Sequence, residues 1–214
     1  MTDFDARARD WDENPDRVAR AKAVAAAIRE QVTLSQATTV LEYGCGTGLL
    51  SFALQADLGP MPLRGTITLA DSSSGMLEVL REKIVASGIK NMTPLKLDLA
   101  VDPLPMERFN LIYTLMTLHH IPEPAKVLQC FQSLLQPGGV LCIADLDKED
   151  GSFHSHEPGF DGHNGFDRAE LHLKLEQAGF TNIRLTTCFE MTKGERTYSL
   201  FLAVAENYLA HETN

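Results

Sequence analysis

Apolar residues recur along this chain with two spacings, one typical of helices and one typical of buried strands. From Val18 to Val32 they recur at three- and four-residue steps, which predicts a helix that begins at Asn14-Pro15, with Asn14 as its cap. Further helices are expected at 49–58, 74–87, 122–136 and 167–178, and strands at 40–43, 65–70, 92–97, 109–114, 140–145, 183–190 and 197–205. Because strands and helices alternate, the pattern predicts an α/β domain built on a mostly parallel sheet.

The first predicted strand runs into a turn with glycine at alternate positions, Gly44, Gly46 and Gly48. A glycine turn between a strand and a helix places backbone N–H groups beside a bound ligand. The spacing differs from the G-x-G-x-x-G of dinucleotide sites, and no Gly-Lys-Ser/Thr follows as in a P-loop. Lysine and arginine are absent from 38–63 and Glu42 precedes the turn, so a ligand with an amine or hydroxyls fits better than a phosphate. S-adenosylmethionine is such a ligand.

Two further predicted strands also end on a carboxylate, Asp71 after the second strand and Asp98 after the third. Ligands of open α/β sheets bind at the carboxyl ends of the strands, where Glu42, Asp71 and Asp98 would lie together. Asp71 can accept hydrogen bonds from both hydroxyls of an adenosine ribose. It could also cap the helix that begins near Ser73. We predict that the three carboxylates surround the cofactor.

The segment Leu41-Glu42-x-Gly44-x-Gly46-x-Gly48 resembles the first motif of class I S-adenosylmethionine-dependent methyltransferases. The resemblance extends from about residue 38 to 145, through a second similar passage, Leu135-x-Pro137-Gly138-Gly139-x-Leu141, and more loosely to 205. It implies a Rossmann-like, doubly wound sheet of seven strands, mostly parallel with an antiparallel last strand. It also implies S-adenosylmethionine as cofactor and methyl transfer by in-line displacement.

The same resemblance assigns roles to residues near the predicted strand ends. It implies that Asp71 binds the ribose, that Asp98 accepts from the adenine amino group, and that Leu99 and Met76 lie against adenine. The residues expected to bind the cofactor are Trp11, Glu42, Gly44, Cys45, Gly46, Gly48, Asp71, Ser72, Met76, Asp98, Leu99 and Thr114.

Two histidines, His119 and His120, follow the fourth predicted strand. In the resembled family a histidine pair here often lies close to the transferred methyl group, but these residues could equally orient the loop and cap the next helix. A general base is needed only if the acceptor is a hydroxyl, a protonated amine or a carbon acid. The candidate catalytic residues are His120, His154 and His163.

The long connection 146–165 contains His154, His156 and His163 among several carboxylates. It is either a substrate lid or a surface loop without chemistry, since long irregular loops are often functional. The three histidines and the neighbouring carboxylates are residue types that could ligate a metal. We nevertheless expect no metal here, and the substrate lid and the surface loop are the favoured alternatives.

The domain organisation follows from these assignments. Residues 1–37 are expected to form an N-terminal arm and helix over the cofactor site, 38–205 the methyltransferase domain, and 206–214 a polar tail. Phe4 and Trp11 either cover the cofactor or only pin the arm to the surface.

Composition narrows the partners. The net charge of −10 argues against a nucleic-acid partner, because nucleic-acid-binding proteins usually carry a basic face. The four cysteines lack metal or disulfide spacing. There is no run of 18 apolar residues and no signal peptide at the start, so we expect a cytoplasmic protein without a membrane partner. A small-molecule acceptor is expected, while its identity and the oligomeric state are not readable from the sequence.

Three functions remain at this stage. The first is a small-molecule methyltransferase, and the second is a protein that holds S-adenosylmethionine without turnover, as a partner or sensor. The third, disfavoured by the glycine spacing and the reversed last strand, is an NAD-dependent oxidoreductase. Product formation separates the first two functions, and nicotinamide dinucleotide binding tests the third.

Overall fold

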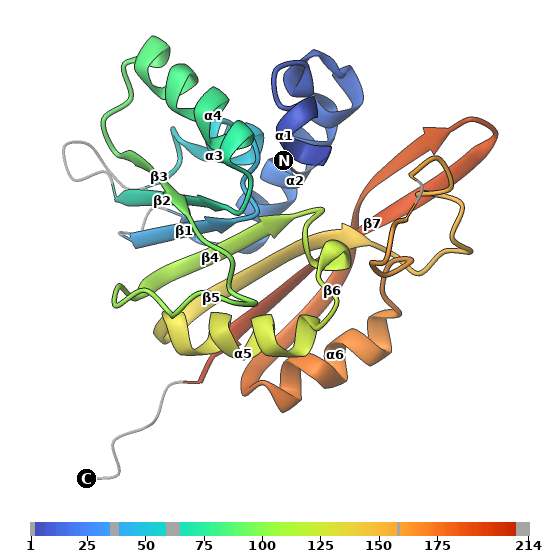
Figure 1. Ribbon diagram of the computed structural model, residues 1–214. Helices are drawn as coiled ribbons and strands as arrows, with labels where there is room; N and C mark the ends of the chain where they lie inside the picture. The colour runs from blue at the N-terminus through green and yellow to red at the C-terminus, as the bar shows by residue number, and fades with distance from the viewer. Residues whose placement is uncertain (1–2, 35–38, 59–64, 158, 209–214) are drawn as a thin grey trace, which may run out of the picture.

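The computed structural model describes residues 3–34, 39–58, 65–157 and 159–208 of the chain. Seven strands form one sheet in the order β3-β2-β1-β4-β5-β7-β6 (Figure 1). The strands are β1 (Thr39–Tyr43), β2 (Thr66–Asp71), β3 (Met92–Lys96), β4 (Phe109–Leu115), β5 (Leu135–Leu146), β6 (Phe180–Lys193) and β7 (Arg196–Asn207). The helices are α1 (Asp3–Arg7), η1 (Trp11–Glu13), α2 (Pro15–Gln31), α3 (Leu49–Leu54), α4 (Ser74–Ser87), η3 (Leu118–His120), α5 (Pro124–Leu134) and α6 (Arg168–Gln177).

The strand directions confirm the predicted fold. Strands β1 to β5 pair in parallel, and β7 pairs antiparallel with both β5 and β6. The strand order reverses beside β1, where β2 lies on one side and β4 on the other. Open α/β sheets bind their ligands at such a switch point, at the carboxyl ends of the strands.

Two apolar cores cover the two faces of the sheet. Side chains alternate between faces along each strand, so Leu41 packs in one core and Val40 in the other. Helices α5 and α6 supply Phe131 and Leu171 to the first core, while α2, α3 and α4 cover the opposite face (Figure 1). Both faces are buried, as expected for parallel strands that read as continuous apolar runs.

Local signals placed several helix ends correctly. Asn14 caps α2 by accepting the backbone N–H of Asp16 at 2.9 Å, and Pro15 occupies the first helical position. Asp167 caps α6 in the same way. Gly88 ends α4 in the left-handed conformation, with φ +68°.

Other boundaries differ from the predicted ones. Helix α3 ends at Leu54, several residues before the expected end at 58. The expected turn Pro137-Gly138-Gly139 lies inside β5, which pairs with Phe109 before its register shifts. The hairpin of β6 and β7 is longer than predicted, because Lys193 already pairs with Arg196 across a two-residue turn. The expected tail 206–214 begins within β7, and its residues 209–214 lie outside the described residues.

The N-terminal segment packs across the carboxyl ends of the strands. The Asp5 carboxylate accepts from the hydroxyl of Ser73 at 2.6 Å and from the N–H of Gly75 at 2.9 Å, which fixes α1 to the start of α4. Lys83 of α4 pairs with Asp12 at 2.5 Å. These contacts hold a short helix that the sequence did not predict. Within the described ranges, no helix is long and apolar enough to cross a lipid bilayer.

Candidate functional site

A cavity of about 590 Å³ lies between the N-terminal segment, the carboxyl ends of β1 to β4, the connection after β5 and the β6–β7 hairpin. This volume falls in the range of about 300–1,000 Å³ typical of small-molecule sites. Of the residues predicted to bind the cofactor, those that line it are Trp11, Glu42, Gly44, Cys45, Gly46, Asp71, Ser72, Met76 and Asp98. Gly48, Leu99 and Thr114 do not line it.

The glycine turn presents its backbone to this cavity. Gly44, Gly46 and Gly48 all adopt positive φ, at +68°, +52° and +83°, a region that strains other residues. The N–H of Gly46 donates to the Asp71 carboxylate at 2.7 Å. A Cβ on Gly46 would stand 3.8 Å from the indole Nε1 of Trp11, so the turn and the N-terminal arm face each other across the cavity wall. The turn therefore fits a close-lying ligand such as S-adenosylmethionine.

The Asp71 carboxylate bridges β1, β2 and α4 at the centre of this site. Its Oδ2 accepts from Gly46 and its Oδ1 accepts the N–H of Ser73 at 2.8 Å. Ser73, rather than Asp71, caps α4, by accepting the N–H of Met76 at 3.1 Å. Burial raises the pKa of Asp71, and the backbone donors oppose that rise. Each carboxylate oxygen retains a lone pair for a further donor, such as a ribose hydroxyl.

Glu42 is the most deeply buried of the three carboxylates, with 2% of its surface exposed. Its side chain accepts from the hydroxyl of Ser51 and, at 3.1 Å, from the Ser51 N–H. The same hydroxyl lies 2.6 Å from the phenol oxygen of Tyr113. Burial raises the pKa of Glu42 to about 8 from its ordinary 4.5, so the cofactor-free protein binds a proton here at neutral pH.

This shift predicts a pH-dependent stability. Because the pKa of Glu42 is about 8 when folded and 4.5 when unfolded, the folded state holds an extra proton between these values. The carboxyl group therefore contributes less to stability as the pH rises from about 4.5 to 8. We expect Glu42→Gln to raise the free energy of unfolding of cofactor-free protein at pH 8 by an amount on the order of a few kcal/mol, with little effect near pH 4.5.

Calorimetric unfolding of wild type and Glu42→Gln at several pH values measures this difference. If the difference in unfolding free energy stays constant across the window, the Glu42 pKa is not raised. Since Glu42 lines the cavity, the same substitution should weaken S-adenosylmethionine binding, so stability and binding should change in opposite directions.

Three residues predicted to bind the cofactor, Gly48, Leu99 and Thr114, lie outside the cavity wall. The N–H of Leu99 donates to the phenol oxygen of Tyr43 at 3.1 Å, so it is already engaged. Gly48 precedes α3, and a Cβ there would lie 2.8 Å from Leu80. Thr114 is buried, and its hydroxyl has no hydrogen-bond partner in the described part of the chain. Cofactor contacts for these three residues stay predictions.

Asp98 follows β3 at the rim of the cavity. Its Oδ1 accepts the N–H of Ala100 at 2.9 Å, and its own N–H donates to Asp102 at 2.8 Å. This tight turn holds the Asp98 carboxylate at the end of β3, and its contact with the adenine amino group stays a prediction.

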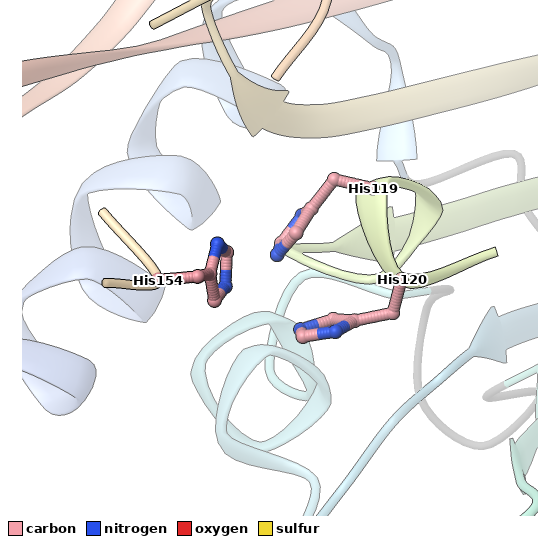
Figure 2. A group of neighbouring side chains, drawn as sticks. All are labelled: His119, His120 and His154. Atoms are coloured by element: carbon pink, nitrogen blue, oxygen red, sulfur yellow. The ribbon is translucent and has the colours of Figure 1, made fainter. Parts of the chain in front are cut away.

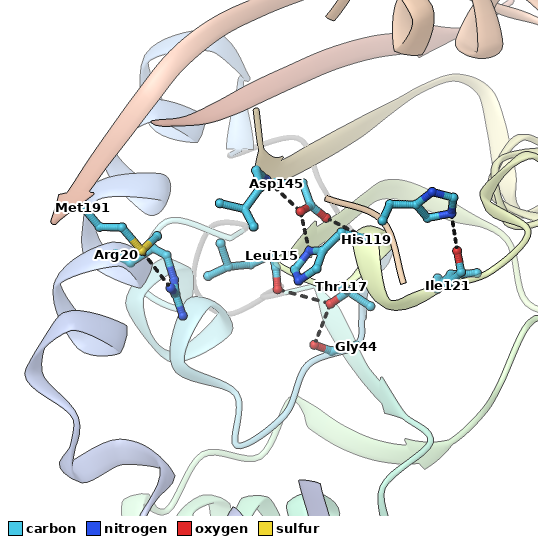
Figure 3. A network of polar contacts seen from close by, with 10 residues as sticks. Arg20, Gly44, Leu115, Thr117, His119, Ile121, Asp145 and Met191 are labelled. Atoms are coloured by element: carbon cyan, nitrogen blue, oxygen red, sulfur yellow. Dashed lines mark hydrogen bonds and ion pairs between the residues drawn. The ribbon is translucent and has the colours of Figure 1, made fainter. Parts of the chain in front are cut away.

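The cavity wall also contains residues that were not singled out from the sequence. Arg20 of α2 reaches into the cavity, donating from Nη1 to the sulfur of Met191 at 3.7 Å, as Figure 3 shows. Its Nε is buried without a partner in the described chain. Burial lowers the pKa of Arg20 to about 10, which leaves the guanidinium charged at neutral pH. Phe153 and Leu115 add apolar wall beside it.

Trp11 lies over the cavity with the guanidinium of Arg17 stacked 3.7 Å from its ring centroid. Phe4 packs edge-on against Trp11, with ring centroids 5.9 Å apart. Arg7 pairs with Glu157 at 3.3 Å, which joins α1 to the connection 146–165 above the cavity. Both segments predicted to cover the site thus contribute side chains to its wall.

The candidate catalytic histidines divide into two sets. His120 and His154 line the cavity, and burial is the main cause that lowers their pKa values to about 3 and about 4. Both rings are therefore neutral at physiological pH. His163 lies outside the cavity wall, and its Nε2 is 3.0 Å from the carbonyl of Ile121.

His119 also lines the cavity and was not among the predicted catalytic residues. Its Nδ1 lies 2.5 Å from Oδ1 of Asp145, and both side chains are fully buried (Figure 3). The Asp145 pKa is lowered by His119 and by backbone donors in spite of burial. Asp145 ends a predicted strand, as Asp71 does, so the strand-end rule could have identified it.

Comparison with known proteins adds a family context. Residues 6–185 match the family model described as a methyltransferase domain. The ubiquinone biosynthesis O-methyltransferase of Marinobacter nauticus is 32% identical over 130 residues, covering 59% of this chain and 51% of that protein. The demethylmenaquinone methyltransferase of Listeria monocytogenes is 30% identical over 115 residues, covering 54% and 47%.

Solved structures share the fold. A SAM-dependent methyltransferase from Aquifex aeolicus superposes with a TM-score of 0.69 at 24% identity, covering 97% of this chain and 100% of that one. The chain spans about half the length of the two curated relatives named above.

Proposed function

This chain belongs to the methyltransferase domain family, as a class I enzyme whose cofactor is S-adenosylmethionine, and we propose that it methylates a small quinone-related molecule carrying an anionic oxygen. The observation that carries the cofactor half is the Asp71 carboxylate, held by the Gly46 N–H at the floor of the cavity. The observation that supports the proposed acceptor is the buried, charged Arg20, whose Nε has no partner in the described chain and which also lines the cavity.

The cofactor would be held by the residues of the strand ends. Asp71 would bind its ribose, Glu42 would lie near its amino acid part, and Asp98 would lie near adenine, with Trp11 above. When bound, S-adenosylmethionine supplies a methyl group that is already electrophilic. The chain's own contribution is then alignment of the acceptor and exclusion of water by the walls around it.

The N-terminal segment and the connection 146–165 are proposed to form that water-excluding cover. Phe4 and Trp11 lie against each other at the cavity, and the Arg7–Glu157 pair joins the two segments. The Arg7–Glu157 pair is partly exposed and contributes little to stability, so breaking it would let the connection 146–165 move away from α1 when ligands exchange.

The acceptor is proposed from the chemistry of the wall. Phe153 and Leu115 suit an aromatic or aliphatic body, and Arg20 suits a carboxylate or phenolate because a guanidinium donates strongly to such groups. The names of two relatives, a ubiquinone biosynthesis O-methyltransferase and a demethylmenaquinone methyltransferase, support a quinone-related compound. The unpartnered Nε of Arg20 would gain an acceptor when such a ligand binds.

A methyl-transfer assay tests this function. Purified protein with S-adenosylmethionine is supplied with a panel of hydroxylated benzoates, naphthoates and quinols, and products are identified by mass spectrometry. The proposal expects one methylated product and stoichiometric S-adenosylhomocysteine with at least one acid-bearing aromatic compound. If cofactor binds and no member of the panel is methylated, the protein is better described as a catalytically silent S-adenosylmethionine-binding partner or sensor.

Substitution of Arg20 tests whether its guanidinium binds the anionic acceptor or the carboxylate of S-adenosylmethionine. We expect Arg20→Met to raise the acceptor KM about 10- to 100-fold, the value of one or two charge-assisted hydrogen bonds, with the Kd of S-adenosylmethionine unchanged. Arg81→Met, on the exposed side of α4, is the matched control and should change neither constant. A loss of cofactor affinity with an unchanged acceptor KM would instead assign Arg20 to the carboxylate of the cofactor.

A further inference from the structure

Three histidines meet at the cavity wall although they come from separate segments. His119 and His120 lie on η3 and His154 lies in the connection after β5, and one ring nitrogen of each lies within 4.8 Å of the others. Figure 2 shows the three rings with nitrogens facing a shared space. The ring centroids are 4.1 Å apart for His119 and His120, and 5.0 Å for His119 and His154.

The cluster is held in place by contacts behind it. Phe160 stacks on His154 with ring centroids 3.8 Å apart and an angle of 6° between the planes. The N–H of His163 donates to the carbonyl of His119 at 2.7 Å, which ties the connection to η3. Gly162 permits this approach, because a Cβ there would collide with that carbonyl and with the Phe160 ring. The loop therefore places His154 beside η3.

Two nitrogens in the cluster are buried and unsatisfied. His119 is 0% exposed, and its Nε2 has no hydrogen-bond partner in the described chain, as is also true of Nδ1 of His154. The other nitrogen of the His119 ring, Nδ1, lies 2.5 Å from Oδ1 of Asp145, so only Nε2 of His119 is available to a ligand. A buried polar atom without a partner is destabilising unless something binds it.

We propose that His119, His120 and His154 bind one divalent transition-metal ion of the zinc type, with an open coordination position facing the cavity. Three neutral imidazoles with one free position match the donor set of catalytic zinc sites. The Asp145–His119 contact matches the carboxylate–histidine arrangement that orients metal ligands and fixes which nitrogen binds. The expectation of no metal considered only residues within the loop, whereas this cluster combines two segments.

The geometry requires a small adjustment. Zinc–nitrogen distances of about 2.0–2.1 Å place tetrahedral ligand atoms about 3.3 Å apart, closer than the 4.8 Å limit within which these atoms lie. Side-chain rotation of His120 and His154 can close that gap, since His120 lies on a short turn and His154 in a loop.

The charges around the cluster leave it able to accept a cation. Arg7 and Lys193 disfavour added positive charge on His120 and His154, and the buried guanidinium of Arg20, in the same cavity wall, interacts with Asp145. Arg7 is paired with Glu157, and the buried Asp145 carboxylate touches His119 directly. The direct negative partner outweighs the more distant and partly paired positive ones, because Coulomb energies fall with distance and are larger in a buried site.

A cobalt titration tests the site without cofactor or acceptor. Protein prepared without a histidine tag and stripped with chelator is titrated with Co²⁺, and the visible absorption of bound cobalt and competition by Zn²⁺ are recorded. We expect one metal ion per chain. His154→Ala should lower the affinity about 100-fold or more, because loss of even an outer-shell partner costs roughly 10- to 100-fold.

His156→Ala is the matched control, since His156 is an exposed histidine two positions from His154 in the same connection. It should leave the affinity and the spectrum unchanged. The site is refuted if wild-type protein shows no cobalt absorption, or if His154→Ala and His156→Ala bind cobalt equally well. The inference does not rest on methyl transfer, so failure of the acceptor assay would leave this readout intact.

Discussion

Asp71→Ala is expected to lower the affinity for S-adenosylmethionine about 100-fold or more. A buried carboxylate that accepts from two ribose hydroxyls contributes two charge-assisted hydrogen bonds, each on the order of 1.5–3 kcal/mol, and the substitution removes both. It also removes the acceptor that holds the Gly46 N–H at 2.7 Å, so the glycine turn loses a fixed partner. The loss of binding free energy should exceed the loss that follows from destabilisation of the cofactor-free protein.

Isothermal titration of S-adenosylmethionine into both proteins measures the loss, with unfolding curves to correct for stability. Asp98→Ala is the companion variant, because Asp98 ends the neighbouring strand and would make a single contact with adenine. We expect it to weaken binding only about 10-fold. Equal effects of the two substitutions, or none for Asp71→Ala, would contradict the assignment of Asp71 to the ribose.

Gly44→Ala is expected to destabilise the protein by about 2–5 kcal/mol and to abolish cofactor binding. The backbone of Gly44 has φ +68°, which costs other residues about 1–2 kcal/mol. A Cβ would also lie 2.8 Å from Cβ of Thr117 and closer still to its Oγ1 and Cγ2, an overlap worth roughly 1–3 kcal/mol more. The turn and the segment after β4 would have to separate, which opens the cavity between them.

Gly88→Ala separates the cost of the positive φ from the cost of the overlap with Thr117. Gly88 has the same φ of +68°, and no atom lies within 4 Å of the Cβ that it lacks. It should therefore cost about 1–2 kcal/mol, and cofactor binding should be kept. Thr117 contacts the Gly44 carbonyl through its hydroxyl at 3.3 Å (Figure 3), and adding Thr117→Ala to Gly44→Ala should restore part of the lost stability. Equal destabilisation by the two glycine substitutions would show that the overlap is relieved elsewhere.

Much of the fold follows from local rules that operate within a few residues. The cap at Asn14, the stop at Gly88 and the alternation of strands and helices are short-range signals, and each is found at the expected place. The carboxylates Asp71 and Asp98 lie at one edge because parallel strands end together. These rules locate the part of the cavity proposed to hold the cofactor, because its residues come from consecutive strand ends.

The part of the cavity proposed for the acceptor depends on contacts between distant segments, and local patterns do not show which residues meet there. Arg20 lies on α2 yet meets Met191 of the β6–β7 hairpin, 171 positions later. The partner of His119 is Asp145, and His154 joins them from a loop. The predicted bounds of β5 and β6 were too short for a related reason. Pairing with neighbouring strands extends both strands beyond their apolar runs.

The most direct test of the central claim is a calorimetric titration of S-adenosylmethionine and, separately, NADH into purified wild-type protein. We predict saturable micromolar binding of S-adenosylmethionine with one site per chain, and no binding of NADH, because Asp71 at the glycine turn fits a ribose and the G-x-G-x-G spacing differs from that of dinucleotide sites. Absence of S-adenosylmethionine binding, or tight binding of NADH in its place, would contradict the account of this cavity.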